Sequence, residues 1–393
     1  MPLKRVLGPA LVSLYGIGTI LGAGIYALIG KIVGVAGIHA PISFFISAIL
    51  AILTGYSYTR LTQLYPKSAG EAEYVYQGTG KTSLSLIIGF LVALSGIISC
   101  ATLLNGFAGY LQIFIPIPIW IGIIASATLG FTLAMIGVKQ SVIFVTIGTI
   151  IEVLGLILIC SMATPNIIEN SDKLQEMLFN IKTSHFTPIV SGAFIAFYAY
   201  IGFEDIVNLA EETKNPGKSL TLAIFISIAV STVLYIWVAI SAISVFEPST
   251  LIESKAPVAD MFAQLGGSPR IISIISLFAI FNGVLAQIIM SSRILYGLRY
   301  PLKSLTWLAK VSEKSQVPRN ATSFVMTIVL ILALFINIQS LAEYTSFTII
   351  IVFSFVNLSL LLIEMRNQKK KILNLIIPGL AMILNLTFLI LQF

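Results

Sequence analysis

The sequence predicts an all-α integral membrane protein with about eleven transmembrane helices. Of its 393 residues, 57% are hydrophobic and only 10% are charged. The apolar residues form stretches of about 20 residues or more, which is enough to cross about 30 Å of hydrocarbon at about 1.5 Å per residue. The connections between these stretches are short, so the chain is expected to be polytopic and without a soluble domain.

Each expected span is a long apolar run. The first begins just after Lys4 and Arg5, and because no small-residue cleavage site follows it, we expect it to remain in the membrane as a span. The spans are expected near residues 7–30, 39–64, 84–114, 118–137, 141–163, 187–210, 220–245, 270–296, 321–338, 342–364 and 372–392.

Positive charge is concentrated on one side of this topology. With the amino terminus inside, all but five of the 23 lysines and arginines are cytoplasmic. The five exceptions are Lys31, Lys173, Lys182, Lys255 and Arg270. We therefore expect a multi-pass protein of the cytoplasmic (plasma) membrane with a cytoplasmic N-terminus. The net charge of +7 follows from this topology and from contact with anionic membrane lipid, and it gives no reason to expect a nucleic-acid partner.

Few residues could carry catalysis or bind a metal. Cys100 and Cys160 lie inside expected spans and are typical of small buried side chains. The two histidines, His39 and His185, fall at outer boundaries, and no His-Glu-x-x-His pattern is present. We expect no enzyme, no cofactor and no metal. No filter motif or ring of charge indicates a channel either.

A glycine cluster occupies the middle of the first span, at Gly16, Gly18, Gly22 and Gly24. Each glycine weakens a helix interior by about 1 kcal/mol relative to alanine. We therefore expect the helix to break at mid-membrane, where irregular backbone is tolerated only against protein or water. Amides and carbonyls freed there can bind a small zwitterion, as in a transporter.

The sixth span has a second weak point, at Gly202, followed by Glu204 and Asp205 deep in the apolar run. A carboxylate at the bilayer centre costs about 2.5–3.5 kcal/mol on insertion scales, so these acids should face a bundle interior, a wet cavity or amides freed by a helix break. Two breaks five helices apart are expected of a five-plus-five inverted repeat, with helices 1 and 6 broken at mid-membrane.

These segments resemble those of the amino acid/polyamine/organocation permease superfamily, and the resemblance covers about residues 5–365. Any one motif is weak, but their order and spacing together are specific. The motifs are Gly18 to Tyr26, Ser57 to Leu61, Tyr65 to Gly70, Tyr74 to Tyr76, Tyr200 to Glu204, Glu211 to Pro216, and Ser292 to Tyr296.

The resemblance implies a transporter core at 1–365 that works by alternating access, with inverted repeats at about 5–163 and 187–365. Residues 366–393 are then an additional C-terminal helix. We expect eleven spans where the family usually has twelve, which puts dimer contacts through the last helices in doubt. The oligomeric state, monomer or homodimer, stays open.

By motif position, the resemblance also implies a substrate site built mainly from backbone. The amides of Gly22, Ala23 and Gly24 would face an amino acid's carboxylate at the positive end of a half-helix. Carbonyls near Thr19, Ile20, Tyr198 and Ile201 would take its ammonium. The other implied binding residues are Phe197 and Gly202. Glu204 matches the acid that relatives use to couple binding to closure.

Each of these residues also has a structural interpretation. Gly18 and Gly22 could form a small-xxx-small packing face. Phe197 and Tyr198 could be core aromatics, and Glu204 could cap the second half-helix.

Glu152 is a further acid inside a span, the fifth, where proton-coupled members of the family often have a lysine. A carboxyl group there could carry a proton through the cycle. The alternative function for Glu152 is that of a sodium ligand. Its purely structural interpretation is a protonated glutamate that is hydrogen-bonded to a neighbouring helix.

The wall residues that can be placed are Ile20, Phe197, Tyr198 and Phe203, and their apolar or aromatic side chains favour a neutral amino acid. We expect its uptake to be coupled to protons. An exchanger and a transporter of cationic amino acids or polyamines are the alternatives. A transporter-like sensor would share every motif, so only a flux measurement separates it.

Overall fold

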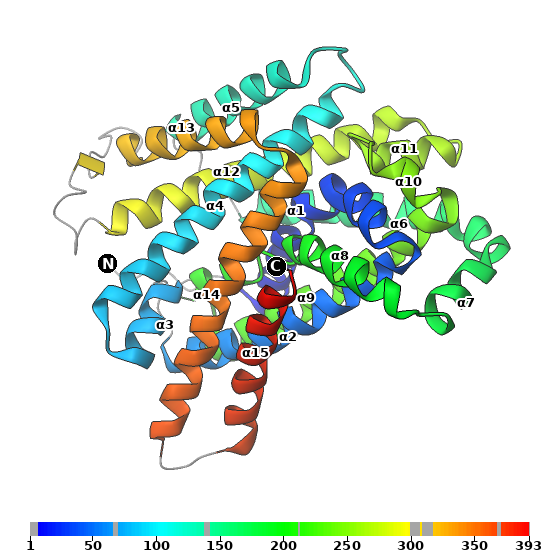
Figure 1. Ribbon diagram of the computed structural model, residues 1–393. Coiled ribbons are helices and arrows are strands. Elements are labelled where there is room, and N and C mark those ends of the chain that lie inside the picture. The colour runs from blue at the N-terminus through cyan, green and yellow to red at the C-terminus, as the bar shows by residue number, and fades with distance from the viewer. Residues whose placement is uncertain are drawn as a thin grey trace.

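The computed structural model describes residues 7–65, 70–136, 142–210, 213–298, 307–308, 317–367 and 371–392. Within these ranges the backbone is a bundle of helices (Figure 1), and an isolated bridge pairs Leu7 with Thr213. The motif residues at 66–69 and 211–212 lie outside the described ranges.

The helices follow the expected spans in order. They are α1 (Pro9–Ala36), η1 (Gly37–His39), α2 (Ala40–Leu64), α3 (Gly70–Thr79), α4 (Thr82–Leu111), α5 (Ile119–Ile136), α6 (Val142–Glu169), α7 (Ser171–Phe179), η2 (Thr183–His185), α8 (Phe186–Tyr198), η3 (Glu204–Leu209), α9 (Pro216–Val245), α10 (Pro248–Leu251), α11 (Pro257–Gln264), α12 (Pro269–Leu298), α13 (Arg319–Phe335), α14 (Ile338–Arg366) and α15 (Ile372–Leu391).

Seven segments in the described part of the chain are helical, long and apolar enough to cross a membrane, and three shorter apolar helices accompany them. One of the seven covers Gly24–Leu64, which runs from α1 through η1 into α2. The all-α membrane class is therefore confirmed. The number of crossings, the inverted repeats and the division at residue 365 stay predictions.

The expected break is confirmed in the sixth span and is wrong for the first. The α8 helix ends at Tyr198, and η3 begins at Glu204 after an irregular stretch. In contrast, α1 continues through the whole glycine cluster, from Pro9 to Ala36. A continuous helix satisfies its own amides and carbonyls, and the glycines are used for close packing instead.

The α1 helix lies at the centre of the bundle, where it contacts α2, α4, α6, α8, α9 and α12 (Figure 1). A second group of contacts joins α4 to α12 and α14, and α15 packs on α2 and α14. The glycine-bearing spans predicted to be paired therefore lie against each other, as α1 on α8.

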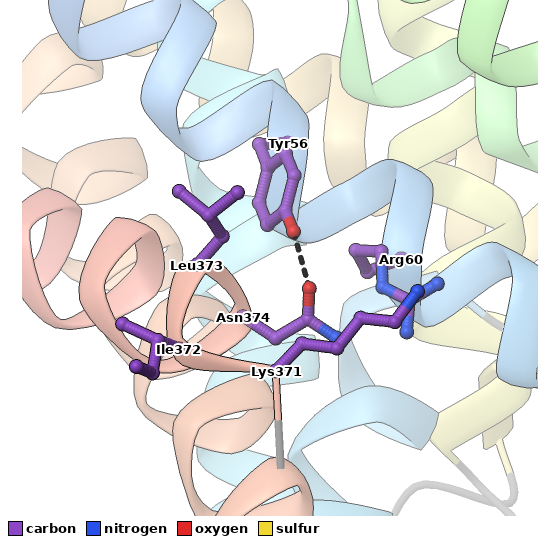
Figure 2. Close-up of a pocket in the computed structure, with 6 residues that line it drawn as sticks. All are labelled: Tyr56, Arg60, Lys371, Ile372, Leu373 and Asn374. Atoms are coloured by element: carbon purple, nitrogen blue, oxygen red, sulfur yellow. Dashed lines mark hydrogen bonds between the residues drawn. The ribbon is translucent and has the colours of Figure 1, made fainter. Parts of the chain in front are cut away.

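Polar side chains hold α15 in place. Tyr56 of α2 donates its hydroxyl to Asn374 Oδ1 at 2.6 Å (Figure 2), and Asn374 Nδ2 donates to Glu364 Oε1 at 2.9 Å. Glu364 also accepts from Arg60 Nη2 at 3.0 Å. Since Arg60 belongs to a family motif, that motif connects α2 to α14.

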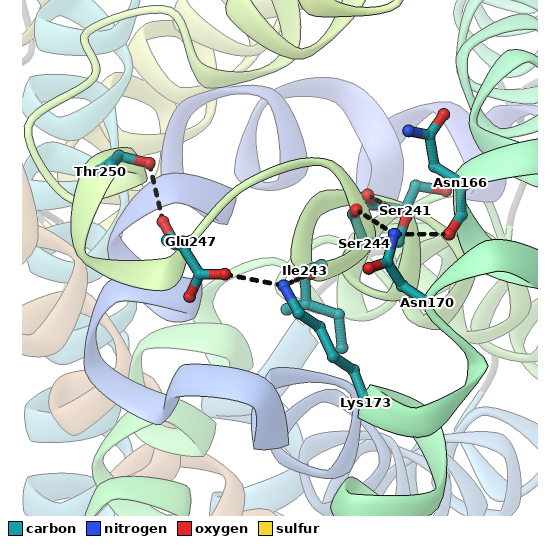
Figure 3. A network of polar contacts seen from close by, with 8 residues as sticks. All are labelled: Asn166, Asn170, Lys173, Ser241, Ile243, Ser244, Glu247 and Thr250. Carbon is teal, nitrogen blue, oxygen red and sulfur yellow. Dashed lines mark hydrogen bonds and ion pairs between the residues drawn. The ribbon is translucent and has the colours of Figure 1, made fainter.

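On the expected outer side, polar contacts join α7 and the residue between α6 and α7 to the end of α9 and the residue before α10 (Figure 3). Asn170 Nδ2 donates to the Ser244 carbonyl at 3.3 Å, and Lys173 Nζ lies 2.9 Å from Glu247 Oε1. The Lys173–Glu247 pair is exposed and should add little to stability.

Candidate functional site

The glycine cluster of α1 faces the irregular stretch that follows α8. A Cβ added at Gly24 would lie 2.5 Å from Ala199 Cα, and one added at Gly16 would overlap the Ile206 side chain. A Cβ at Gly18 would overlap Thr149 of α6. These glycines therefore let two neighbouring segments approach the α1 backbone, which favours the packing interpretation for this face.

Gly202 is the centre of the break. Its φ of 125° is a conformation that residues with a Cβ rarely adopt, and an added Cβ would lie 2.6 Å from the Thr19 carbonyl oxygen. Its carbonyl accepts from Thr19 Oγ1 at 3.1 Å, and its N–H donates to Glu204 Oε2 at 2.8 Å. The Glu204 side chain thus satisfies an amide that the break sets free. The N-terminus of η3 has no side-chain cap within the described part of the chain, so the interpretation of Glu204 as a cap of the second half-helix was wrong.

Tyr235 of α9 joins the two segments, and the sequence interpretation missed it. Its buried hydroxyl lies 2.7 Å from the Ile20 carbonyl of α1 and 2.7 Å from the Ala199 carbonyl after α8. The available signal was a tyrosine inside an apolar span, because a buried tyrosine hydroxyl needs a partner. Two backbone carbonyls of the candidate site are therefore engaged by one side chain.

Phe197 and Tyr198 point to different neighbours. Phe197 lies in an aromatic cluster with Phe353 of α14 and Phe388 of α15, with ring centroids 6.1 and 6.4 Å away. The Tyr198 hydroxyl reaches α4, where it lies 3.0 Å from Ser99 Oγ and donates to the Ser99 carbonyl at 3.2 Å. Phe197 thus packs as a core aromatic, while Tyr198 bridges α8 to α4.

The backbone of the other implied binding residues is mostly occupied. The Tyr198 carbonyl accepts from the Ile201 N–H at 3.2 Å, and the Ile20 carbonyl accepts from Tyr235. Gly22 and Ala23 lie within the continuous α1 helix, and their side-chain environment is outside what the structure describes. An amino acid could reach the amides of Gly22, Ala23 and Gly24 only if α1 opens there.

Glu152 lies in α6 with 4% of its surface exposed. Its carbonyl accepts from the Tyr26 hydroxyl of α1 at 3.1 Å, which ties the fifth span to the first. Its side-chain oxygen Oε2 is buried and has no hydrogen-bond partner among the described residues. An ionised carboxylate in that position would be costly, so the group is suited to hold a proton.

Comparison with known proteins agrees with this architecture. The family model described as amino acid permease matches residues 10–393. The branched-chain amino acid permease BcaP of Bacillus subtilis is 27% identical over 99% of this chain and 88% of its own. An uncharacterised protein of Methanocaldococcus jannaschii is 28% identical over 87% of this chain and 79% of its own.

A plant protein is also similar. Cationic amino acid transporter 1 of Arabidopsis thaliana is 27% identical over 88% of this chain and 60% of its own length. The family match spans nearly the whole chain, including α1, the break after α8 and α15. The chain therefore belongs to the amino acid permease family, within the amino acid/polyamine/organocation superfamily.

Proposed function

We propose that this protein is a secondary active transporter that carries neutral amino acids into the cell by alternating access, driven by protons. It is a transporter and not an enzyme, its membrane is the cytoplasmic membrane, and its N-terminus is cytoplasmic. The observation that carries this proposal is the irregular stretch after α8, packed on the glycine face of α1. Backbone of this kind inside a membrane protein is used to bind small charged groups.

The proposed binding event opens α1. The amides of Gly22, Ala23 and Gly24 then bind the carboxylate, and carbonyls near Thr19, Ile20, Tyr198 and Ile201 take the ammonium. Glycine lowers the cost of this opening, because each glycine contributes about 1 kcal/mol less to helix stability than alanine does. Glu204, bonded to the Gly202 amide, would link opening to movement of the break.

A neutral substrate is supported by apolar surroundings. Ile20 and Phe203 are buried beside the break, and a related protein is named a branched-chain amino acid permease. Other relatives are named cationic amino acid transporters, so cationic amino acids are the second candidate substrate class.

Proton coupling is assigned to Glu152. Its carboxyl group is buried beside α1, and its free oxygen lacks a partner among the described residues, which suits a group that gains and loses a proton. A sodium ion held there is the alternative coupling.

The test is uptake of labelled amino acids into proteoliposomes with an inward proton gradient, an inward sodium gradient, or unlabelled amino acids inside and no gradient. Accumulation only with the proton gradient supports the proposal. Accumulation under the other conditions indicates sodium symport or exchange instead. No uptake by folded protein favours a sensor.

Glu152→Gln isolates the coupling residue. We expect the variant to lose dependence on the proton gradient while it still exchanges amino acids. Glu169→Gln, at the exposed end of the same helix, is the matched control and should behave like the wild type. If the uptake by Glu152→Gln depends on the proton gradient as wild-type uptake does, Glu152 has a structural role and does not couple transport to protons.

A further inference from the structure

A groove of about 660 Å³ opens between α2 and the beginning of α15 (Figure 2). We call it the α2–α15 groove, and its lining comes from the two helices and the residue before α15. The lining residues are Tyr56, Arg60, Lys371, Ile372, Leu373 and Asn374. None of these lining residues belongs to α1 or to the break after α8, so the chemistry of the groove requires a separate explanation.

The base of the groove is polar and fixed. Asn374 is buried and is held by Tyr56 on one side and Glu364 on the other. The Glu364 carboxylate is paired with Arg60 Nη2 at 3.0 Å, while Arg60 Nη1 donates to Gln63 Oε1 at 2.9 Å. The one acid at the base is therefore already balanced by a cation.

The groove has one positive charge more than the Arg60–Glu364 pair neutralises, at Lys371. Lys371 lies at its mouth, and Figure 2 shows its side chain extending toward Arg60. Lys371 forms no ion pair with a carboxylate among the residues that the structure describes. The buried Arg60 Nε also lacks a hydrogen-bond partner there. Two cationic side chains that face one groove favour an anion between them.

The sequence just before the last span is strongly basic. Four basic residues occur within six positions, at Arg366, Lys369, Lys370 and Lys371, directly before the last span. Such clusters next to a transmembrane helix bind anionic lipid, with about 1 kcal/mol contributed by each cation near the surface. In the proposed orientation this end of α15 faces the anionic inner leaflet.

Apolar side chains complete the groove. Ile372 is 71% exposed and Leu373 is 66% exposed, at the first turn of a helix that is apolar enough to span the membrane. In a bilayer these side chains contact acyl chains, while Lys371 and Arg60 lie at headgroup level. A soluble anion would use the cations and leave the apolar rim without a role.

We infer that the α2–α15 groove is a binding site for the headgroup of an anionic phospholipid, whose acyl chains lie along the start of α15. Lys371 supplies the charge that distinguishes an anionic from a zwitterionic headgroup. The Arg60–Glu364 pair and Asn374 position the polar wall. Bound lipid would join α2, α14 and α15.

The test measures the apparent Kd of the full-length protein for phosphatidylglycerol and for phosphatidylcholine with the same acyl chains, by native mass spectrometry from detergent. We expect phosphatidylglycerol to bind about fivefold more tightly, and Lys371→Gln to remove that preference. Lys371→Arg should retain it. Lys81→Gln, at an exposed lysine before α4, is the control and should also retain it.

Four results would overturn the inference. They are equal affinity for both lipids in the wild type, an unchanged preference in Lys371→Gln, an equal loss in Lys81→Gln, and full displacement of phosphatidylglycerol by inorganic phosphate. The last result would identify a site for a soluble anion. Because no arm of the test measures transport, failure here leaves the proposed function untouched.

Discussion

Gly202→Ala should be the most damaging of the conservative changes at the break, for two separable reasons. The first is conformational, because a φ of 125° is strained for alanine and costs about 1–3 kcal/mol. The second is steric, because the new Cβ would lie 2.6 Å from the Thr19 carbonyl oxygen, and crowding in a packed interior costs about 1–3 kcal/mol. Together these give about 2–6 kcal/mol of destabilisation.

Two other glycines separate the contributions. Gly266 has a φ of 84° and nothing within 4 Å of an added Cβ, so Gly266→Ala should show the conformational cost alone. Gly379 lies inside α15, also with nothing within 4 Å, so Gly379→Ala should stabilise by about 0.5–1 kcal/mol.

The assay is thermal unfolding of the three purified variants in the same detergent, with amino acid uptake measured in parallel. The expected order of Tm is Gly379→Ala above wild type, then Gly266→Ala, then Gly202→Ala. An equal loss of Tm in Gly266→Ala and Gly202→Ala would refute the close approach of α1 to the break.

Three further predictions concern packing, a shared hydrogen bond and a buried acid. Gly24→Ala should lower stability by about 1–3 kcal/mol and reduce uptake, because the new Cβ meets Ala199 Cα at 2.5 Å. Tyr235→Phe should lower stability by about 1–3 kcal/mol, because it removes a hydroxyl whose one proton is shared between two buried carbonyls. Burial raises the pKa of the Glu71 carboxyl above its ordinary 4.5, so its contribution to stability is fully present below pH 4.5 and is lost as pH rises through the raised value. Glu71→Gln, which keeps an acceptor for the Tyr58 hydroxyl, should flatten that decline.

Thermal unfolding checks all three, with uptake added for Gly24→Ala. Tyr344→Phe, at a half-exposed tyrosine of α14, is the control for Tyr235→Phe, and an equal change in both would argue against the shared hydrogen bond. Glu253→Gln is the exposed control for Glu71→Gln. A pH profile of Glu71→Gln that coincides with the wild type would exclude Glu71 as the source of the decline.

Hydropathy was sufficient to predict the fold class. In hydrocarbon each backbone group must be paired within its own segment, so long apolar runs become helices whatever their neighbours are. The break after α8 was also predictable, since Gly202 and the buried Glu204 together indicate an unwound segment with an acid beside it.

The first span shows where local reasoning ends. Glycine permits unwinding and also permits close approach, and the choice depends on what lies opposite. For α1 the opposing groups are Ala199, Ile206 and Thr149, which are remote in sequence. The Thr19–Gly202 hydrogen bond joins residues 183 positions apart, and the Tyr235–Ile20 bond joins residues 215 apart. Contacts of this kind leave no trace in the pattern of a single span.

The Tyr235 hydroxyl has one proton and two acceptors at equal distance. At any instant it can donate to the Ile20 carbonyl of α1 or to the Ala199 carbonyl after α8, but not to both. If the two segments move apart during transport, the hydroxyl can keep its hydrogen bond to either segment. The separation therefore leaves no buried donor without a partner. Tyr235 would then release one segment while its hydroxyl stays hydrogen-bonded to the other. The carbonyl on the released side would lose the tyrosine bond and could accept one from an incoming ammonium group.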